Sequence, residues 1–357
     1  MTQRRQLLLM ALIVLTGLLT ACSPASAARK PRTTEAVRPM TSPTKHPEAS
    51  SAPGTSAGTT AVWAEITPHA AFPTSYNFPV YVERDRMWAF HPQGIWSSAD
   101  GKSWEKAKLP TIRHSVYETT YVQFNHAVYA LGKNQGNYLD LRFGSAIRRT
   151  TDFQTWELLA QSSNLPNRVF HGTVVFDGKI WLLGGFDGRN HHNDVWHSSD
   201  GVHWTQATAH AAWTPRQVDK CVVFQNRIWV IGGDVIDGMP TSNPRAAQEI
   251  WSSADGVNWT LVTDQVQLSG NSPVVFDGKL WLVGANRDGT FARASQITTD
   301  GIHWQEAPAP WTPRGGVATW IFDGKLFMTG GKYSVTENGH IRFIYSNDVW
   351  ALTPTRS

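Results

Sequence analysis

The sequence lacks the marks of several protein classes. Only two of its 357 residues are cysteine, so no disulfide framework holds it together. The 29 glycines and 20 prolines leave no long helical period between them, which excludes a coiled coil or a helix bundle. No G-x-S-x-G, H-E-x-x-H or P-loop motif occurs. With 41% hydrophobic and 17% charged residues, the chain is nevertheless predicted to fold around a sizeable core.

The N-terminus has the pattern of an export signal. Arg4 and Arg5 precede an apolar run, Leu7 to Ala21, which is short for a membrane span and suited to a secretory signal. The run ends in Leu-Thr-Ala-Cys, which resembles the lipobox of bacterial lipoproteins, and this resemblance implies acylation of Cys22. Ser23 after it resembles the sorting pattern for an outer membrane. Cleavage after Ala27 instead, at an Ala-Ser-Ala site, would release a secreted protein.

The positive charge of the protein lies outside its folded part. Residues 22–61 are rich in Ser, Thr, Pro and Ala and lack aromatic residues, so we expect a disordered tether after a signal peptide at 1–21. Residues 1–62 hold seven of the 32 basic and two of the 28 acidic residues, which leaves 25 basic and 26 acidic residues in the remainder. Nucleic acid is therefore not an expected partner.

The other cysteine, Cys221, lies in an apolar run with Val222, Val223 and Phe224. This surrounding predicts a small hydrophobic residue of the core and not a nucleophile.

All 17 tryptophans lie at or after Trp63, and five of them close a recurring Asp-Gly-x-x-Trp phrase. The copies end at Trp104, Trp204, Trp259 and Trp304, with a degenerate copy ending at Trp156. Asp-Gly between β-forming residues predicts a tight hairpin in which the aspartate bonds the turn backbone.

Two further phrases complete the repeat. One is Phe-Asp-Gly-Lys-Ile-Trp-Leu-Leu-Gly-Gly at 176–185, with related copies near residues 84, 124, 224, 276 and 322, and the other is Asn-Asp-Val-Trp at 193–196. Together the phrases predict four short strands per repeat and six repeats, hence an all-β, six-bladed β-propeller over residues 62–357. The sixth repeat lacks its fourth strand, whereas Val62 to Thr67 resembles one. We therefore expect this N-terminal strand to complete the last blade and close the ring.

The double glycine, the Asp-Val-Trp phrase and the Arg-Val-Phe-His of 168–171 resemble Kelch repeats over the whole of the predicted propeller. The Asp-Gly-x-x-Trp turn also resembles the Asp-box of sialidases but is one residue short. The Kelch resemblance implies a distant similarity to the central domain of galactose oxidase and to sialic-acid mutarotases. Galactose oxidase needs copper and a tyrosine-cysteine crosslink, and Cys221 has no tyrosine near it in sequence, so we expect no cofactor and no metal.

Strand order predicts that the loops after Gly-Gly share one face of the ring, where binding residues are usually placed. Arg168, Arg216 and Arg314 all lie eight residues before the inner-strand phenylalanine, and this register directs them to the channel mouth. A ring of guanidinium groups would bind an acidic sugar through paired hydrogen bonds. The alternative is structural, with each arginine bonded to carbonyls of the next blade.

Other candidate residues lie on the same face. Arg189, Arg245 and Arg287 are on comparable loops and are candidates for ligand binding, and Arg142 is a further rim residue. His171 and Asp219, each three residues after an arginine, are weak candidates for an acid and a base.

The adjacent His191 and His192 point apart on an extended chain, which disfavours a shared metal. Trp213 and Trp311, in two Trp-Thr-Pro-Arg phrases, are assigned to connections between blades, with stacking on a sugar as the alternative.

Two functions fit these patterns. The first is a lipid-anchored, extracytoplasmic binding module without catalytic activity, whose partner is an acidic sugar or an envelope protein and whose bilayer contact is the acylated Cys22. The second is a carbohydrate-active enzyme of the mutarotase or epimerase type, since fold alone does not determine chemistry.

Overall fold

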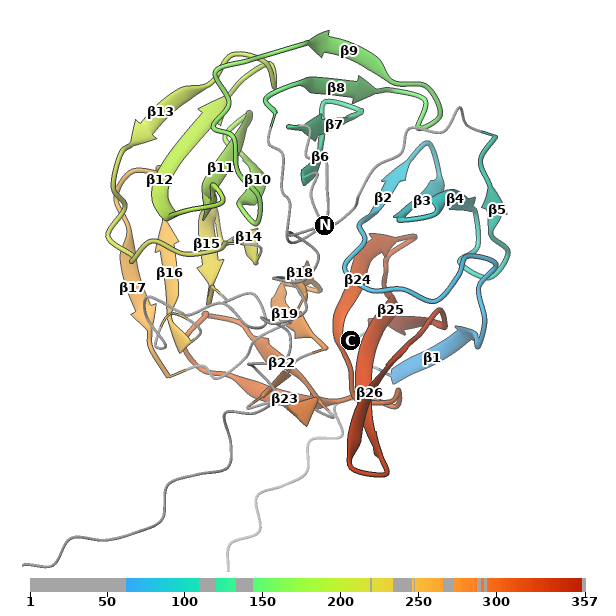
Figure 1. Ribbon diagram of the computed structural model, residues 1–357. Helices are drawn as coiled ribbons and strands as arrows, with labels where there is room; N and C mark the ends of the chain where they lie inside the picture. The colour runs from blue at the N-terminus through green and yellow to red at the C-terminus, as the bar shows by residue number, and fades with distance from the viewer. Residues whose placement is uncertain are drawn as a thin grey trace, which may run out of the picture. The chain divides into compact units, whose positions relative to one another are not determined.

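The repeated phrases form strands as expected. The computed structural model describes residues 62–108, 120–132, 144–218, 220–233, 246, 248–265, 272–284, 286–287, 290–291 and 294–354, all within one unit, Gly58–Ser357. Among these residues the strands form six antiparallel blades around a central axis, five of them four-stranded and one five-stranded, together with a two-stranded hairpin (Figure 1). The predicted six-bladed propeller is thereby confirmed.

The first three blades follow one another in the chain. Blade 1 contains β2 (Val80–Glu83), β3 (Arg86–His91), β4 (Gly94–Ser98) and β5 (Glu105–Lys106). Blade 2 contains β6 (Thr120–Phe124), β7 (Ala127–Leu131), β8 (Ile147–Thr150) and β9 (Glu157–Ala160). Blade 3 contains β10 (Gly172–Phe176), β11 (Lys179–Phe186), β12 (His191–Ser198) and β13 (Thr205–Thr208).

Two of the other three blades carry additions. Blade 4 contains β14 (Cys221–Phe224), β15 (Arg227–Ile231), β16 (Ile250–Ser253) and β17 (Thr260–Thr263). Blade 5 contains β18 (Ser272–Phe276), β19 (Lys279–Val283), β22 (Ala294–Thr298) and β23 (Gln305–Pro308), and a small hairpin of β20 (Asn286–Arg287) and β21 (Thr290–Phe291) joins β19 to β22. Blade 6 contains β24 (Gly315–Phe322), β25 (Lys325–Glu337), β27 (Val349–Thr353) and β1 (Val62–Thr67), and β26 (His340–Tyr345) pairs with the extended end of β25.

The N-terminal strand closes the ring, as the sequence predicts. β1 pairs antiparallel with β27, with Trp63 opposite Leu352. The Trp63 ring is buried and meets the ring of Trp311 edge to face at 4.4 Å. Both ends of the ordered ring therefore lie in one sheet, and the outer edge of blade 6 is covered by the start of the chain.

The core is divided among the contacts between blades. Six buried clusters each combine residues of two neighbouring blades. On β11, Trp181 packs toward blade 4 while Ile180 and Leu182 pack toward blade 2. Alternation along a strand thus supplies both of its faces with apolar side chains, which explains why the tryptophans recur at fixed positions.

The two Asp-Gly phrases form different turns. Between β10 and β11, Asp177 and Gly178 have φ of +49° and +65°, which is the tight hairpin expected for this pair. Between the third and fourth strands the connection is longer. In blade 1, Asp100 Oδ1 accepts hydrogen bonds from the backbone N–H groups of Lys102 and Ser103, each at 2.8 Å, so the carboxylate shapes a six-residue turn.

The longer turn requires a glycine because an aromatic ring of the preceding blade lies against it. A Cβ on Gly256 would lie 2.1 Å from the ring of Trp181, and one on Gly201 would lie 2.6 Å from the ring of Tyr129. Each aromatic ring therefore packs against bare backbone, and the turn docks one blade onto the next.

Among the described residues, no helix has the length and apolar character to cross a bilayer.

The turn aspartates make stability depend on pH. The backbone N–H of Ser103 is the main cause that lowers the pKa of Asp100 to about 2 from an ordinary value of 3.8. A carboxyl whose pKa is lower in the folded state adds stability above about pH 4 and loses it as the pH falls toward 2. We expect Asp100→Asn, which keeps an acceptor oxygen but no charge, to reduce the loss of stability between pH 4 and pH 2, measured as urea midpoints.

The control for this prediction is Asp323→Asn. Asp323 is exposed in the short turn between β24 and β25, and in the described part of the chain its carboxylate accepts no hydrogen bond. An equal change in pH dependence for both variants would contradict the role assigned to Asp100.

Candidate functional site

The three repeated arginines are buried and bonded, each within the blade that it precedes. Arg168 donates to Gly184 O at 3.0 Å and forms paired bonds with the carboxylate of Asp194 at 2.5 and 3.0 Å. Arg314 repeats this arrangement with Gly330 O and Asp348. The paired geometry is the strongest that an arginine makes with a carboxylate.

Blade 4 contains a variant of the same contact. Arg216 bonds the carboxylate of Glu249 and the carbonyl oxygens of Gly232 and Ala246. Burial lowers the pKa of Arg216, and the hydrogen bond and negative charge of Glu249 oppose this effect. The charge is thus held inside the protein by its partner.

Each acid also binds the tryptophan of its own phrase. Asp194 Oδ2 accepts from Trp196 Nε1 at 2.7 Å, and Asp348 Oδ2 accepts from Trp350 Nε1 at 2.8 Å. The Asp-Val-Trp phrase is therefore an acid and an indole two residues apart on the third strand, both facing the arginine. We name this unit of arginine, carboxylate and indole the arginine lock.

The double glycine makes room for the arginine lock. A Cβ on Gly233 would lie 2.4 Å from Cδ of Arg216, and one on Gly331 would lie 2.9 Å from Cδ of Arg314. The first glycine of a pair faces the adjoining blade instead, because a Cβ on Gly184 would lie 2.9 Å from Arg216 O. Arginine, glycine pair and acid are thus one structural unit in blades 3, 4 and 6.

These contacts correspond to the structural alternative for the arginines. The exposed fractions of Arg168, Arg216 and Arg314 are only 7%, 3% and 3%, and each guanidinium lies in a different blade. Binding of an acidic sugar by these side chains would compete with a carboxylate already in place. That binding stays a prediction.

His171, the candidate acid, is at the loop end of the blade 3 inner strand. It is 5% exposed, and within the described part of the chain neither ring nitrogen has a hydrogen-bond partner. Burial, with a smaller contribution from the positive charge of Arg168, lowers the pKa of His171 to about 3. The imidazole is therefore neutral at physiological pH, which is the form that accepts a proton. A role of His171 in catalysis stays a prediction.

The loop of blade 3 separates its two adjacent histidines. His192 Nε2 lies 2.8 Å from Asp187 Oδ2, whereas the ring of His191 packs on Phe186 at 5.0 Å. The expectation that the two rings point apart is confirmed. Arg189 is exposed in the same loop, and its backbone N–H donates to Asp187 Oδ1. Among the described residues, no group of three or more His, Cys, Asp or Glu side chains gathers around a possible metal position.

Several candidates fall outside the described part of the chain. These are Cys22, Arg142, Asp219 and Arg245. Arg287 lies in β20 opposite Thr290, and its side chain is likewise outside the description. The assignment of the Trp-Thr-Pro-Arg tryptophans to connections between blades agrees with their burial, since Trp213 is fully buried among residues of blades 3 and 4 and Trp311 is 5% exposed among residues of blades 5 and 6.

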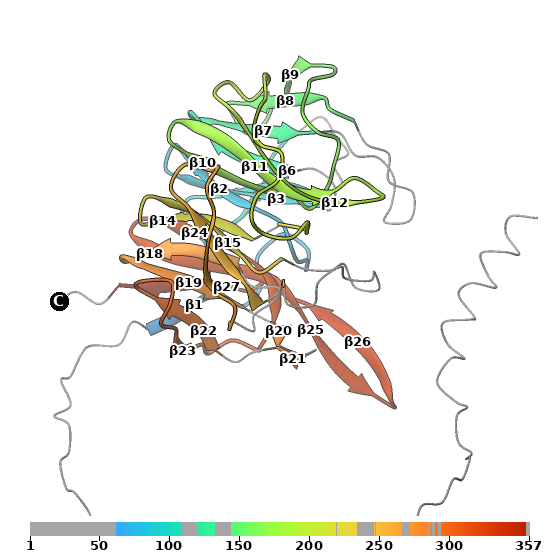
Figure 2. The ribbon, with the colours of Figure 1, turned by 90° about the vertical axis from the view of Figure 1, so that its left-hand side faces the viewer.

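The β25–β26 hairpin is a surface feature that the sequence analysis treated only as a variable loop. Figure 2 shows it extending beyond the neighbouring blades. Ile341, Phe343 and Tyr345 are 69%, 46% and 39% exposed, and their register places them on one face. The Asn338-Gly339 pair between alternating apolar residues was the available signal, because Asn-Gly favours a two-residue hairpin.

The arginine lock generates a prediction about stability. Replacing Arg168 by alanine leaves the Asp194 carboxylate buried without its partner, which is expected to cost about 3–5 kcal/mol in the free energy of unfolding. Urea unfolding is the measurement, and exposed Arg189→Ala is the control, expected to change stability by less than about 0.5 kcal/mol. Wild-type stability of Arg168→Ala, together with loss of acidic-sugar binding, would instead assign Arg168 to a ligand.

Comparison with known proteins agrees with this fold. An alignment over 209 positions that covers 51% of this chain shows 27% identity to the dynein alpha chain of the flagellar outer arm of Chlamydomonas reinhardtii, of which it spans only 4%. The solved structure of YjhT superimposes with a TM-score of 0.60 at 12% identity, over 80% of this chain and 96% of YjhT, which is a likeness of fold. Residues 40–269, more than half of the chain, match the DUF6242 beta propeller domain. The chain belongs to the DUF6242 beta propeller domain family.

Proposed function

We propose that the protein is a lipid-anchored, extracytoplasmic propeller that binds an envelope protein and catalyses no reaction. The acylated Cys22 and the tether of residues 22–61 would hold the propeller outside the cytoplasm, at the outer membrane where the host has two membranes. The observation that carries the proposal is the β25–β26 hairpin, because its exposed apolar face has no partner in the described part of the chain beyond its own base.

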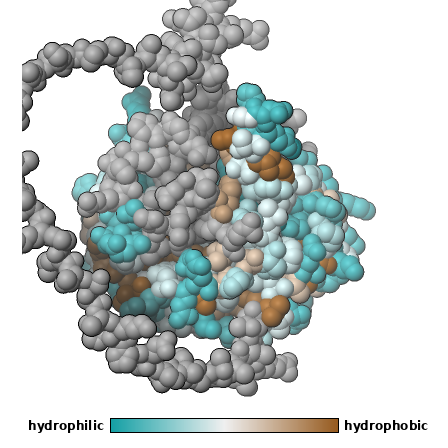
Figure 3. All heavy atoms as spheres, turned by 90° about the horizontal axis from the view of Figure 1, so that it is seen from below, coloured by the Kyte–Doolittle hydropathy of each residue, from teal (hydrophilic) through white to brown (hydrophobic). Residues whose placement is uncertain are grey.

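The hairpin is well suited to contact another protein. Ile341, Phe343 and Tyr345 lie opposite Thr336, Ser334 and Lys332 on β25, so one face combines apolar and polar groups. Exposed apolar groups rimmed by polar residues are typical of protein-binding surfaces, and aromatic residues are enriched there. Figure 3 shows apolar residues as separate patches among polar ones on the face seen there, which is consistent with a local contact site.

The base of the hairpin is held in place. Lys332 Nζ lies 4.7 Å from the ring of Tyr76 and 4.9 Å from that of Phe343, and the rings of Tyr76 and Tyr345 are 5.4 Å apart. These contacts join the hairpin to the entry into blade 1. A surface that is already ordered loses less conformational freedom when it binds.

The free edge of β26 adds a second binding element. Within the described chain β26 pairs only with β25, so its outer backbone groups are available to an added strand. Its single charged residue besides His340, Arg342, is paired with Glu337 at 2.9 Å. The edge therefore carries little charge that would oppose pairing with a partner strand.

Site-specific photocrosslinking tests this proposal. A benzophenone-bearing phenylalanine analogue at Phe343, in the full chain expressed in its host, is expected to give a discrete crosslinked protein that Ile341→Ser weakens by about tenfold or more. The matched control is the analogue at Ile302, which is 54% exposed in a turn of blade 5. Equal products from both positions, or none from Phe343, would contradict protein binding by the hairpin.

A mutarotase or epimerase acting on an acidic sugar is the second candidate. The feature that favours it is His171, whose neutral imidazole has both nitrogens unpaired beside Arg168 at the loop end of β10. If this candidate is correct, the protein accelerates exchange between the anomers of N-acetylneuraminate, followed by NMR, and His171→Gln loses at least about 90% of that acceleration. A wild-type rate equal to the buffer rate would remove the candidate.

A further inference from the structure

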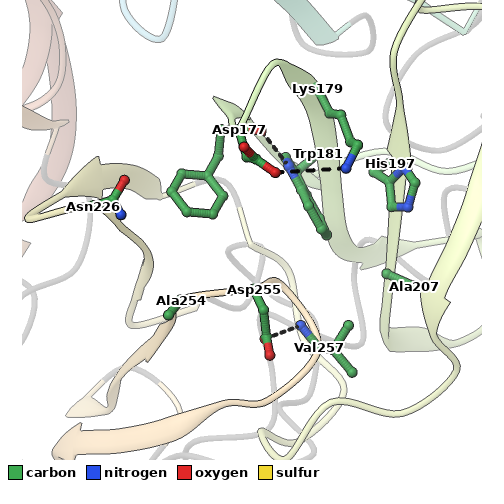
Figure 4. A pocket seen from close by; sticks show the side chains of 10 residues that line it. Asp177, Lys179, Trp181, His197, Ala207, Asn226, Ala254, Asp255 and Val257 are labelled. Carbon is green, nitrogen blue, oxygen red and sulfur yellow. Dashed lines mark hydrogen bonds and ion pairs between the residues drawn. The ribbon is translucent and has the colours of Figure 1, made fainter.

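A groove lies between blades 3 and 4 on the face of the Asp-Gly turns, away from the variable loops. Its volume is about 550 Å³, within the range of small-molecule sites. Its walls are β10, β11 and β12 on one side and the turns of blade 4 on the other (Figure 4). This site is independent of the hairpin and of the arginine lock.

The repeats explain why this groove is open, because the equivalent position between blades 4 and 5 is bridged. There Gln225 Nε2 donates a hydrogen bond to Thr299 O at 2.6 Å. Between blades 3 and 4 the residue that matches Gln225 is Asp177, and the residue that matches Thr299 is Ala254. A carboxylate cannot donate to a carbonyl oxygen, so the bridge does not form.

The contact between blades 2 and 3 differs from the groove in the size of two side chains. There the matching positions hold Arg149, which bonds Glu157 at 2.7 Å, and Leu159. In the groove these positions hold the smaller His197 and Ala207. The groove therefore has two smaller side chains than the contact between blades 2 and 3, and it lacks the bridge of the contact between blades 4 and 5.

The groove wall combines the ring of His197, which lies over the buried Trp181, with unused polar groups. The rings of Trp181 and His197 are 5.0 Å apart, and both side chains border the cavity in Figure 4. Within the described part of the chain, neither His197 nor Asn226 makes a side-chain hydrogen bond. Burial first, and then the charge of Lys179, lowers the pKa of His197, so its neutral ring supplies one donor and one acceptor.

The wall carries one cationic and two anionic side chains. Lys179 Nζ lies 3.9 Å from Asp177 Oδ2. The carboxylate of Asp255 already accepts from the backbone N–H groups of Val257 and Asn258, each at 2.8 Å. The wall therefore offers mixed donors and acceptors, and Asp255 has no cationic partner among the lining residues.

We infer that this groove binds a neutral pyranose sugar. An uncharged ring with several hydroxyl groups gives each free donor and acceptor of Asp177, Lys179 and His197 a partner. Its C–H face packs against the half-buried ring of His197 and the exposed side chain of Val257. An anionic ligand would lose hydration and meet the carboxylate of Asp255, which has no cationic partner in the groove.

The test uses the intact protein and two single substitutions on β13. The probes are methyl glucopyranoside and methyl galactopyranoside, with glucuronate and glucosamine as charged comparisons, and binding is measured by titrating the His197 ring signals in NMR spectra. The wild type is expected to bind at least one neutral glycoside. Ala207→Leu, which introduces the residue found at this position in blade 2, is expected to fill the groove and weaken binding by about tenfold or more.

The matched control is Gln206→Leu. Gln206 is the exposed neighbour of Ala207 on the same strand, and blade 4 has Leu261 at this position, so the control adds an equal side chain outside the groove. It is expected to bind within about twofold of wild type, with unfolding midpoints measured for both variants. The inference is overturned if neither neutral glycoside binds, if Ala207→Leu binds as the wild type does, or if a charged sugar binds better.

Discussion

The structure depends on the packing of an aromatic ring from one blade against the turn glycine of the next. Trp181 on Gly256 and Trp229 on Gly301 are repeats of one contact, and a single Cβ at either glycine would overlap the ring. Where one blade supplies the ring and the next supplies the glycine, neither completes its core alone, and in blade 2 Phe153 takes the place of the glycine and stacks on Trp88. Closure by β1 matters for the same reason, since it completes blade 6 beside the aromatic pair of Trp63 and Trp311.

The two faces of the ring differ in the connections between their strands. On the loop face, the arginine locks of blades 3, 4 and 6 fix the ends of the strands by buried ion pairs, which leaves the segments beyond Gly-Gly free to vary. β25–β26 is one such segment, and it carries exposed apolar residues away from the ring. On the turn face the connections are short and repeated, and the groove between blades 3 and 4 lies beside the small residues Ala207 and Ala254.

Much of the fold could be predicted because each turn motif occurs in several repeats, so that several copies support the same assignment of strands and turns. Asp-Gly, Gly-Gly and Asp-Val-Trp each recur at one spacing, and the missing fourth strand was recognised in Val62 to Thr67. The site was less predictable. The register correctly grouped Arg168, Arg216 and Arg314, but it could not show that each guanidinium meets an acid 26 to 34 residues further along the chain. The β25–β26 hairpin was not predicted, although the Asn338-Gly339 pair favours a two-residue turn between strands.

The sequence by itself determined the number of blades, the order of strands and the closure of the ring, because these follow from local turn chemistry and from the period of the repeat. Only the tertiary structure decided which polar side chains of the described residues are paired with other protein groups and which are not. His197 is open to solvent while its counterpart Arg149 is paired, and this difference depends on side chains that folding brings together from separate strands. Contacts between blades, and not residue types alone, therefore decide where this propeller can bind.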